Sequence, residues 1–200
     1  MMPTKFDFES GALCLDFANT VNWHASDHPE DGLMGYADLA RWGEAAGMLT
    51  PGKAEQLIQR GEAEPENAAE SLARAVKLRE AIYRIFASIS DGSPTSQDDL
   101  KILNLALSQS LSHLQIIHSP EGFAWSWEET STGFERIEWA VARSAAELLT
   151  SKKLSRTRKC ADERGCGYLF IDTSRNRSRR WCSMESCGNR AKARRHYQNQ

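Results

Sequence analysis

Apolar side chains recur at helical spacing along most of the first 150 residues. Apolar positions three and four residues apart line one face of a helix, and this pattern runs through several segments. It predicts helices over Leu33–Met48, from Pro51 to about Arg60, over Leu72–Ile89, from Ser96 through Leu107, and over Ile137–Leu148. Thr50 before Pro51 is a typical helix start, and the spacing of Ser96 and Asp99 is that of a capping box. Arg79 is the one polar side chain within the apolar stripe of Leu72–Ile89.

Shorter segments follow a period of two residues, which is typical of strands. The alternation in Phe6–Phe8 and Leu13–Phe17 predicts a short hairpin or two strand pieces. Leu114–Ile117 and Phe123–Trp127 predict an antiparallel hairpin with aromatic side chains on one face. Asn19–Gly32 is polar and predicts a loop. The expected fold class is therefore α+β, a mostly helical N-terminal domain with short antiparallel strands.

The distribution of charge divides this chain in two. Residues 1–150 carry a net charge of −12 and residues 151–200 a net charge of +10, which give −2 for the whole chain. An acidic body with a basic tail is typical of a protein with a nucleic-acid-binding appendage. We predict a domain over residues 1–150, a basic linker over 151–159 and a small module over 160–200. The domain over residues 1–150 can bury a hydrophobic core of its own, whereas a module as small as residues 160–200 usually needs a bound metal or a disulfide for stability.

Four of the five cysteines lie in the C-terminal module as two pairs. Five residues separate Cys160 from Cys166, four separate Cys182 from Cys187, and fifteen lie between the pairs. Two such pairs supply the four thiolates of a tetrahedral structural zinc site. No segment resembles a signal peptide or a membrane span, so we expect a cytoplasmic protein, in which a reducing environment favours zinc over the alternative of disulfides. Cys14 lies among apolar neighbours and is expected to be an inert core thiol.

The residues around the cysteines predict the layout of the module. Tyr168–Asp172 is strand-like and lies between the cysteine pairs, and Asn189–Gln198 is rich in helix-forming residues. The expected order is first cysteine pair, hairpin, second pair and helix, which resembles a treble clef. A helix start beside Cys187 offers N–H groups that stabilise a thiolate.

Basic side chains surround the expected zinc site. Lysine and arginine neutralise phosphates, and arginine and asparagine also bind base edges. We predict DNA as the partner, with contacts from Arg175, Arg177, Arg179, Arg180, Asn189, Arg190, Lys192, Arg194 and Arg195. Trp181 is expected to pack inside the module rather than stack on a base.

The N-terminal domain has polar residues that suggest a binding site for a regulatory ligand. Candidates for a pocket that binds a small effector are Asp16, Asn19, Asn22, Trp23 and His24, with His28 close in sequence. The alternative is an ordered loop in which these side chains bind nearby backbone groups. A homodimer is also a candidate, because paired half-sites multiply the specificity of a regulator. Shielding of the basic module by the acidic domain is a further interpretation.

Two segments resemble a known family. Phe170–Met184 followed by Cys187–Lys192 is similar to the signature of the CGNR zinc-finger proteins, and Cys-Gly-Asn-Arg is the tetrapeptide that names them. Gly11–Val21 is similar to the opening of the companion ABATE domain. The resemblance implies a bacterial regulator of transcription induced by stress. It also implies a DNA-binding finger held by one zinc ion on Cys160, Cys166, Cys182 and Cys187.

Other classes of function remain to be weighed. The sequence has no glycine-rich phosphate loop, no nucleophile elbow and no His-Glu-x-x-His motif. Four thiolates also leave a zinc ion no open position for hydrolysis, so we do not expect an enzyme. A redox- or zinc-responsive sensor stays open, since oxidised thiolates release their metal. A module that binds RNA or a protein without reading a DNA sequence also stays open.

Overall fold

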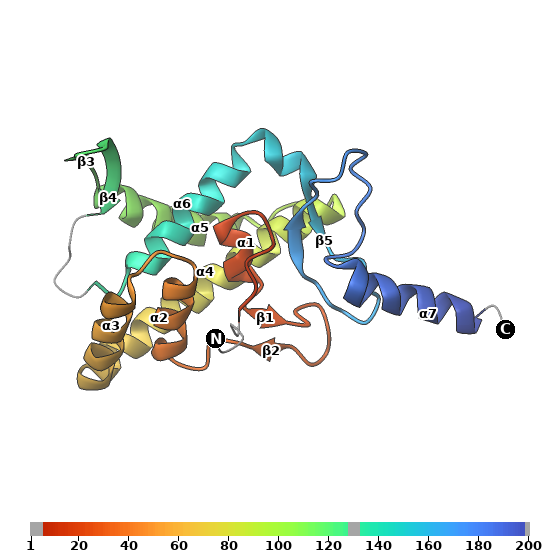
Figure 1. Ribbon diagram of the computed structural model, residues 1–200, viewed down its shortest axis with the longest axis horizontal. Helices are drawn as coiled ribbons and strands as arrows, with labels where there is room; N and C mark the ends of the chain where they lie inside the picture. The colour runs from red at the N-terminus through yellow and green to blue at the C-terminus, as the bar shows by residue number, and fades with distance from the viewer. Residues whose placement is uncertain (1–5, 128–132, 199–200) are drawn as a thin grey trace.

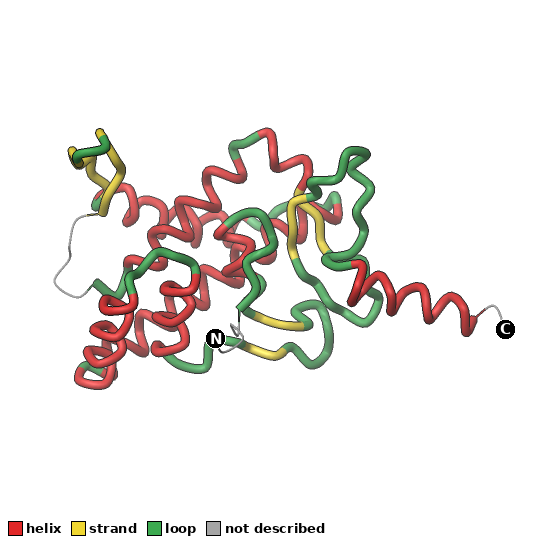
Figure 2. The backbone as a smooth tube through the Cα atoms, in the orientation of Figure 1, coloured by secondary structure: helices red, strands yellow, loops and turns green. Residues whose placement is uncertain are grey.

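The computed structural model describes residues 6–127 and 133–198. Helices dominate these residues, and the strands form antiparallel pairs (Figures 1 and 2). The α-helices are α1 Leu13–Ala18, α2 Tyr36–Ala45, α3 Pro51–Ala63, α4 Pro65–Asp91, α5 Gln97–Ser112, α6 Arg136–Leu149 and α7 Asn189–Gln198. The strand pairs are β1 Val21–Asn22 with β2 Glu30–Asp31, β3 Leu114–Ser119 with β4 Gly122–Trp127, and β5 Thr157–Lys159 with β6 Leu169–Ile171. The α+β class predicted from the sequence is confirmed.

Helix α4 runs through the centre of the molecule (Figure 1) and contacts α1, α2, α3, α5, α6 and β5. The middle of its apolar stripe is buried, with Ile82 and Phe86 fully enclosed, whereas Leu72 and Ile89 are partly buried. Phe17 of α1 packs against Trp42 of α2 with ring centroids 4.8 Å apart. Because helices from both ends of the domain meet on α4, the core is continuous from α1 to α6.

The predicted helices are present, and most differences lie at their ends. Thr50 caps α3, and its hydroxyl accepts a hydrogen bond from the Lys53 N–H at 3.3 Å. Helix α4 begins at Pro65 rather than near Leu72, because proline suits the first helical position and only Glu64 separates α3 from α4. Gly92 ends α4 in the left-handed conformation with φ of 68°.

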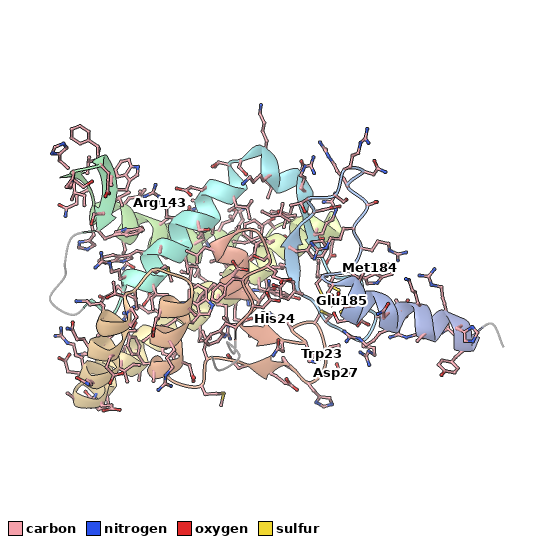
Figure 3. The ribbon with its side chains drawn as sticks, in the orientation of Figure 1. Trp23, His24, Asp27, Arg143, Met184 and Glu185 are labelled. Atoms are coloured by element: carbon pink, nitrogen blue, oxygen red, sulfur yellow. The ribbon has the colours of Figure 1, made fainter. Side chains whose placement is uncertain are left out.

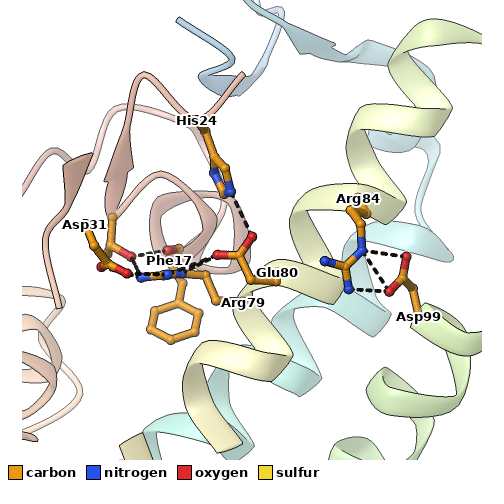
Figure 4. Close-up of polar contacts among 8 residues, drawn as sticks. Phe17, His24, Asp31, Arg79, Glu80, Arg84 and Asp99 are labelled. Atoms are coloured by element: carbon orange, nitrogen blue, oxygen red, sulfur yellow. Dashed lines mark hydrogen bonds and ion pairs between the residues drawn. The ribbon is translucent and has the colours of Figure 1, made fainter. Parts of the chain in front are cut away.

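The expected capping box at Ser96 is wrong. Ser96 is the N-cap of α5, but its side chain makes no capping hydrogen bond. The Asp99 carboxylate is buried and accepts hydrogen bonds from Arg84 of α4 at 2.6–3.0 Å (Figure 4). The Asp99 carboxylate therefore binds Arg84 of the neighbouring helix and does not cap the backbone at the start of α5.

The two strand pieces expected near the N-terminus are also wrong. Phe6–Phe8 has no regular structure, and Leu13–Phe17 lies in helix α1. Cys14, Leu15 and Phe17 are completely buried, so α1 is enclosed on all sides. A helix without a solvent face has no helical period in its sequence, which explains the misleading alternation.

Arg79, within the apolar stripe of α4, is buried and forms ion pairs with carboxylates. Its guanidinium donates to both carboxylate oxygens of Asp31 at 2.7 and 2.8 Å and also to Glu80 at 3.0 Å (Figure 4). Glu80 in turn lies 2.9 Å from His24. This network fastens the segment with β1 and β2, expected to be a loop, onto the central helix.

The C-terminal residues pack against the body at one end of the molecule, and the β3–β4 hairpin lies at the other (Figure 1). The 3₁₀ helix Lys152–Arg156 and strand β5 occupy the predicted linker at residues 151–159. The Lys159 N–H donates to the Ser90 hydroxyl of α4 at 2.8 Å. The proposed division of the chain into domains stays a prediction.

Candidate zinc centre and nucleic-acid surface

The first cysteine pair lies in the loop between β5 and β6. Cys160 follows β5 directly, and its N–H donates to the Tyr168 carbonyl at 2.8 Å. Gly165 and Gly167 have φ of +87° and +69°, which lets this loop turn back tightly. A side chain on Gly165 would come within 2.6 Å of the Ser26 backbone, so only glycine allows the loop to approach the body this closely.

The hairpin is formed by other segments than the expected hairpin between the two cysteine pairs. Strand β6 pairs with β5, which precedes the first cysteine pair, with Lys159 opposite Leu169. The residues before Cys182 form no strand; instead the Arg180 carbonyl accepts from the Ala161 N–H at 2.9 Å. The cysteine pairs are therefore brought together by this hairpin and by hydrogen bonds between the two loops, which include that of the Cys182 N–H to the Cys160 sulfur at 3.4 Å.

The second cysteine pair leads into helix α7. Ser183 caps a π-helical turn over Met184–Gly188 and accepts from the Glu185 N–H. Cys187 is buried inside this turn, immediately before α7 begins at Asn189. The last cysteine thus stands at the start of a helix, as the sequence predicts.

The four sulfurs converge on one point. All four lie within 4.8 Å of one another, with 3.8 Å between Cys166 and Cys182 and 3.5 Å between Cys182 and Cys187. Sulfurs on a tetrahedral zinc ion with Zn–S bonds of about 2.3 Å are about 3.8 Å apart. The donor set and its spacing therefore fit one structural zinc ion on Cys160, Cys166, Cys182 and Cys187.

The sulfurs also need a cation for electrostatic reasons. Hydrogen bonds from Cys166 and Cys182 lower the pKa of Cys160, and the same bonds to Cys160 raise the pKa of both donors. Burial raises the pKa of Cys187. Only a bound cation lets all four sulfurs be thiolates together, because a soft divalent metal stabilises the coordinated thiolates.

Asp162 and Arg190 form the layer of contacts around the sulfurs. Arg190 donates to the Cys187 sulfur at 2.8 Å and to the Asp162 carboxylate at 3.1 Å. Arg194 lies 3.5 Å from Asp162 and donates to Glu163 at 2.5 Å. Burial alone would raise the pKa of Asp162, but the Arg164 N–H and Arg190 lower it below its ordinary range. The two arginines thus orient α7 against the metal site.

The predicted nucleic-acid residues divide into two groups. Three are partly buried in contacts within the finger, namely Arg179, Arg190 and Arg194. Arg179 lies over the Phe170 ring at 4.5 Å and donates to the carbonyls of Trp181 and Cys182. The others are exposed: Arg175, Arg177 and Arg180 on the loop before Cys182, and Asn189, Lys192 and Arg195 on α7.

Trp181 packs within the finger. It is partly buried against the cluster of Cys160, Phe170 and Cys187, and Arg180 lies over its ring at 5.5 Å. Asp172 is fully buried nearby, and its carboxylate accepts from the N–H groups of Ser174 and Arg179 at 2.8 and 3.0 Å. These contacts fix the start and the end of the arginine-rich loop.

Trp23 links the body to the finger. Trp23 is labelled in Figure 3. The guanidiniums of Arg164 and Arg190 each lie 5.1 Å from its ring centre. Its backbone is held in the left-handed region with φ of 55°. Neither this contact nor the convergence of arginines on Asp162 is predicted by the sequence analysis. The available signal for the convergence was an acidic residue two positions after the first ligand in a basic module.

The candidate pocket residues are only partly brought together. Asp16, Asn19 and Asn22 line one cavity of about 340 Å³ with Asp7, Glu30 and Tyr168. Burial raises the pKa of Asp16 to about 6. His24 lies elsewhere, stacked on Tyr83 with ring centroids 3.5 Å apart, and His28 is exposed.

Two loops that present four thiolates to one ion, followed by a basic helix, define a zinc-finger protein joined to a helical body. Comparison with family models agrees: residues 11–152 match the ABATE family, described as "Putative stress-induced transcription regulator", and residues 156–200 match the CGNR zinc finger. The chain therefore belongs to the ABATE family and carries a CGNR zinc finger. No curated protein matches it. Among the described residues, none of the helices has the length and apolar character needed to cross a bilayer.

Proposed function

We propose that the protein is a zinc-dependent DNA-binding regulator of transcription that acts in the cytoplasm, without enzymatic activity. One observation carries this proposal. A finger held by zinc displays exposed cations that form no ion pair among the described residues. These cations are Arg175, Arg177, Arg180, Lys192 and Arg195. Cations whose charge is not neutralised within the protein can neutralise phosphates, and the body, at −12, cannot.

The two groups of basic residues would then have different roles. The exposed cations contact phosphates, while Arg179, Arg190 and Arg194 hold the loop and α7 in place for them. Asn189 is exposed at the first position of α7 and is the proposed reader of a base edge. Arg180 and Arg195 line one concavity of about 280 Å³ between the loop and α7, which supports a single continuous binding surface.

Single substitutions test this division. Arg180→Ala and Arg195→Ala should weaken binding to duplex DNA and each lower the slope of log affinity against log salt by about 1. Arg41→Ala, which removes an exposed cation from the acidic body, is the matched control and should change neither quantity. Equal effects of all three substitutions would contradict the assignment to the finger. Competition by single-stranded RNA at equal concentration would decide between DNA and RNA.

We further propose that the cavity beside Asp16 and Asn19 binds a small effector. Asp7, Asp16, Glu30 and Asp31 line it, and the Asp31 carboxylate is already paired with Arg79. The three other acidic residues suit a cationic ligand rich in N–H donors. Asn19 donates to the Leu169 carbonyl and accepts from the Leu169 N–H, both at 2.8 Å. A ligand that contacts Asn19 would thereby act on β6, which leads into the arginine-rich loop of the finger.

Thermal unfolding in the presence of aliphatic diamines, polyamines and arginine tests the effector site. At least one of these cations should raise the melting temperature, because a ligand that binds only the folded state stabilises it. Asn22→Ala and Glu30→Gln should abolish the increase, whereas Glu70→Gln on the exposed face of α4 should retain it. No stabilisation by any of the cations, or equal stabilisation of all variants, would contradict the proposal.

A further inference from the structure

The β3–β4 hairpin has one strongly apolar face. Residues paired across an antiparallel ladder share a face, and the register places Ile116 opposite Trp125 and His118 opposite Phe123. Leu114 and Trp127 complete the same face. The other face holds Gln115, Ser119 and Ser126 with Ile117 and Ala124. The hairpin is therefore amphipathic, and its apolar face is suited to burial against another surface.

The body covers only the base of that face. Trp127 is partly buried, and its indole N–H donates to the Ser110 hydroxyl of α5 at 3.3 Å. Further out, Arg143 of α6, labelled in Figure 3, lies 5.3 Å from the Trp125 ring centre by its guanidinium carbon. Beyond this point the apolar side chains remain exposed to solvent, with Ile116 at 61 %, Trp125 at 57 % and Phe123 at 81 %.

Such a hairpin is unfavourable in isolation. A two-stranded sheet in water is marginally stable on its own and gains stability when one face is covered. An exposed aromatic patch of this kind marks an interaction site on a soluble protein. The six residues of the apolar face include no Asp, Glu, Lys or Arg, so a covering surface need supply no opposite charge.

We infer that this face is a homodimer interface in which two hairpins pack against each other about a two-fold axis near the Ile116–Trp125 pair. A fully exposed aromatic side chain carries roughly 200 Å², so the three exposed side chains present about 400 Å² per copy. Two copies bury about 800 Å² from these side chains alone, close to the roughly 1,000 Å² of a specific interface. His118 and the rim supply the remainder.

Charge does not oppose a second copy at this face. The acidic bodies carry −12 each and repel one another where body meets body. The uncharged hairpin face is a place where they can approach without bringing acidic groups together. It also lies at the opposite end of the molecule from the finger (Figure 1), so dimerisation leaves the finger uncovered. The two fingers of such a dimer point away from each other.

Sedimentation equilibrium of the full-length, zinc-loaded protein tests the inference without reference to DNA. The wild-type protein should be a dimer, and Phe123→Ser combined with Trp125→Ser should be a monomer with the same zinc content and far-UV circular dichroism. Ile117→Ser changes an exposed apolar residue on the opposite face and should remain a dimer.

Three results would overturn it. A wild-type monomer at concentrations up to about 100 µM would show that the face is vacant or serves another partner. A dimer that survives the double substitution, or one lost equally in Ile117→Ser, would place the interface elsewhere. Because no DNA is present, failure here leaves the proposed DNA binding untouched, and failure of DNA binding leaves the dimer interface untouched.

Discussion

Asp162 is the residue on which the arginines of the finger converge. Its buried carboxylate contacts Arg190 and Arg194 of α7 and lies 3.8 Å from Arg164. Arg190 also touches the Cys187 sulfur. One carboxylate thus links a zinc ligand, the helix after it and the contact with Trp23. The arginine-rich sequence predicted a cationic surface, but only the structure separates the arginines that are held within the finger from those that face solvent.

Asp162→Asn should weaken zinc binding by about 10–100-fold, because it frees Arg190 from its anchor beside Cys187. Competition between the protein and a chromophoric chelator measures the affinity. Glu163→Gln removes a neighbouring but exposed carboxylate and should change the affinity little. Equal zinc affinities for the two variants would show that Asp162 does not support the metal site.

Glu138 gives the body a specific pH dependence. Burial raises its pKa from 4.5 to about 7, with Ser71 and Arg74 as its partners. The folded protein therefore binds this proton more tightly than the unfolded chain, so stability is lost as the pH rises from about 4.5 through about 7. Glu138→Gln should therefore reduce the loss of unfolding free energy over this pH range by up to about 3 kcal/mol. Denaturant unfolding at pH 5 and pH 8 measures it, and an unchanged pH dependence would contradict this account.

At the scale of elements, sequence periodicity predicts those helices and strands that have one face in the core and the other in solvent. Helices α2 to α6 and the β3–β4 hairpin were predictable because each has a polar side. Helix α1 was not, because Leu15 and Phe17 are enclosed by other elements on every side. The partner of β6 was also beyond a local pattern, since β5 precedes the cysteines and was assigned to a linker.

Strand β6 has two buried faces that belong to different clusters. Leu169 and Ile171 pack into the core of the body, whereas Phe170 packs with Cys160 and Cys187 beside the metal site. The Ile171 N–H also donates to the Ser10 carbonyl at 2.8 Å. A three-residue strand therefore connects the stability of the body to the metal.

Removal of zinc should consequently lower the melting temperature of the whole chain. Release of β6 exposes Leu169 and Ile171, each worth about 1.5–3 kcal/mol, which corresponds to a decrease of roughly 10 °C. Calorimetry with and without EDTA measures it, and Cys182→Ser should melt at the lower temperature and not respond to the chelator. A body transition that EDTA leaves unchanged would contradict this coupling.

At the scale of the molecule, the regions proposed for DNA binding and for dimerisation lie at opposite ends. The finger with α7 lies at one end, the β3–β4 hairpin at the other, and the helical body between them (Figure 1). The proposed effector cavity lies where the body meets β6, because Asn19 and Tyr168 both line it.

The most direct test of the central claim is the affinity of the full-length protein for duplex DNA as a function of salt, with and without a zinc chelator. Five exposed cations on the finger predict binding whose log affinity falls against log salt with a slope of about −4 to −5. Chelation should abolish that binding. Absence of binding at low salt with zinc confirmed in the protein, or binding that survives chelation, would contradict a zinc-held DNA-binding surface.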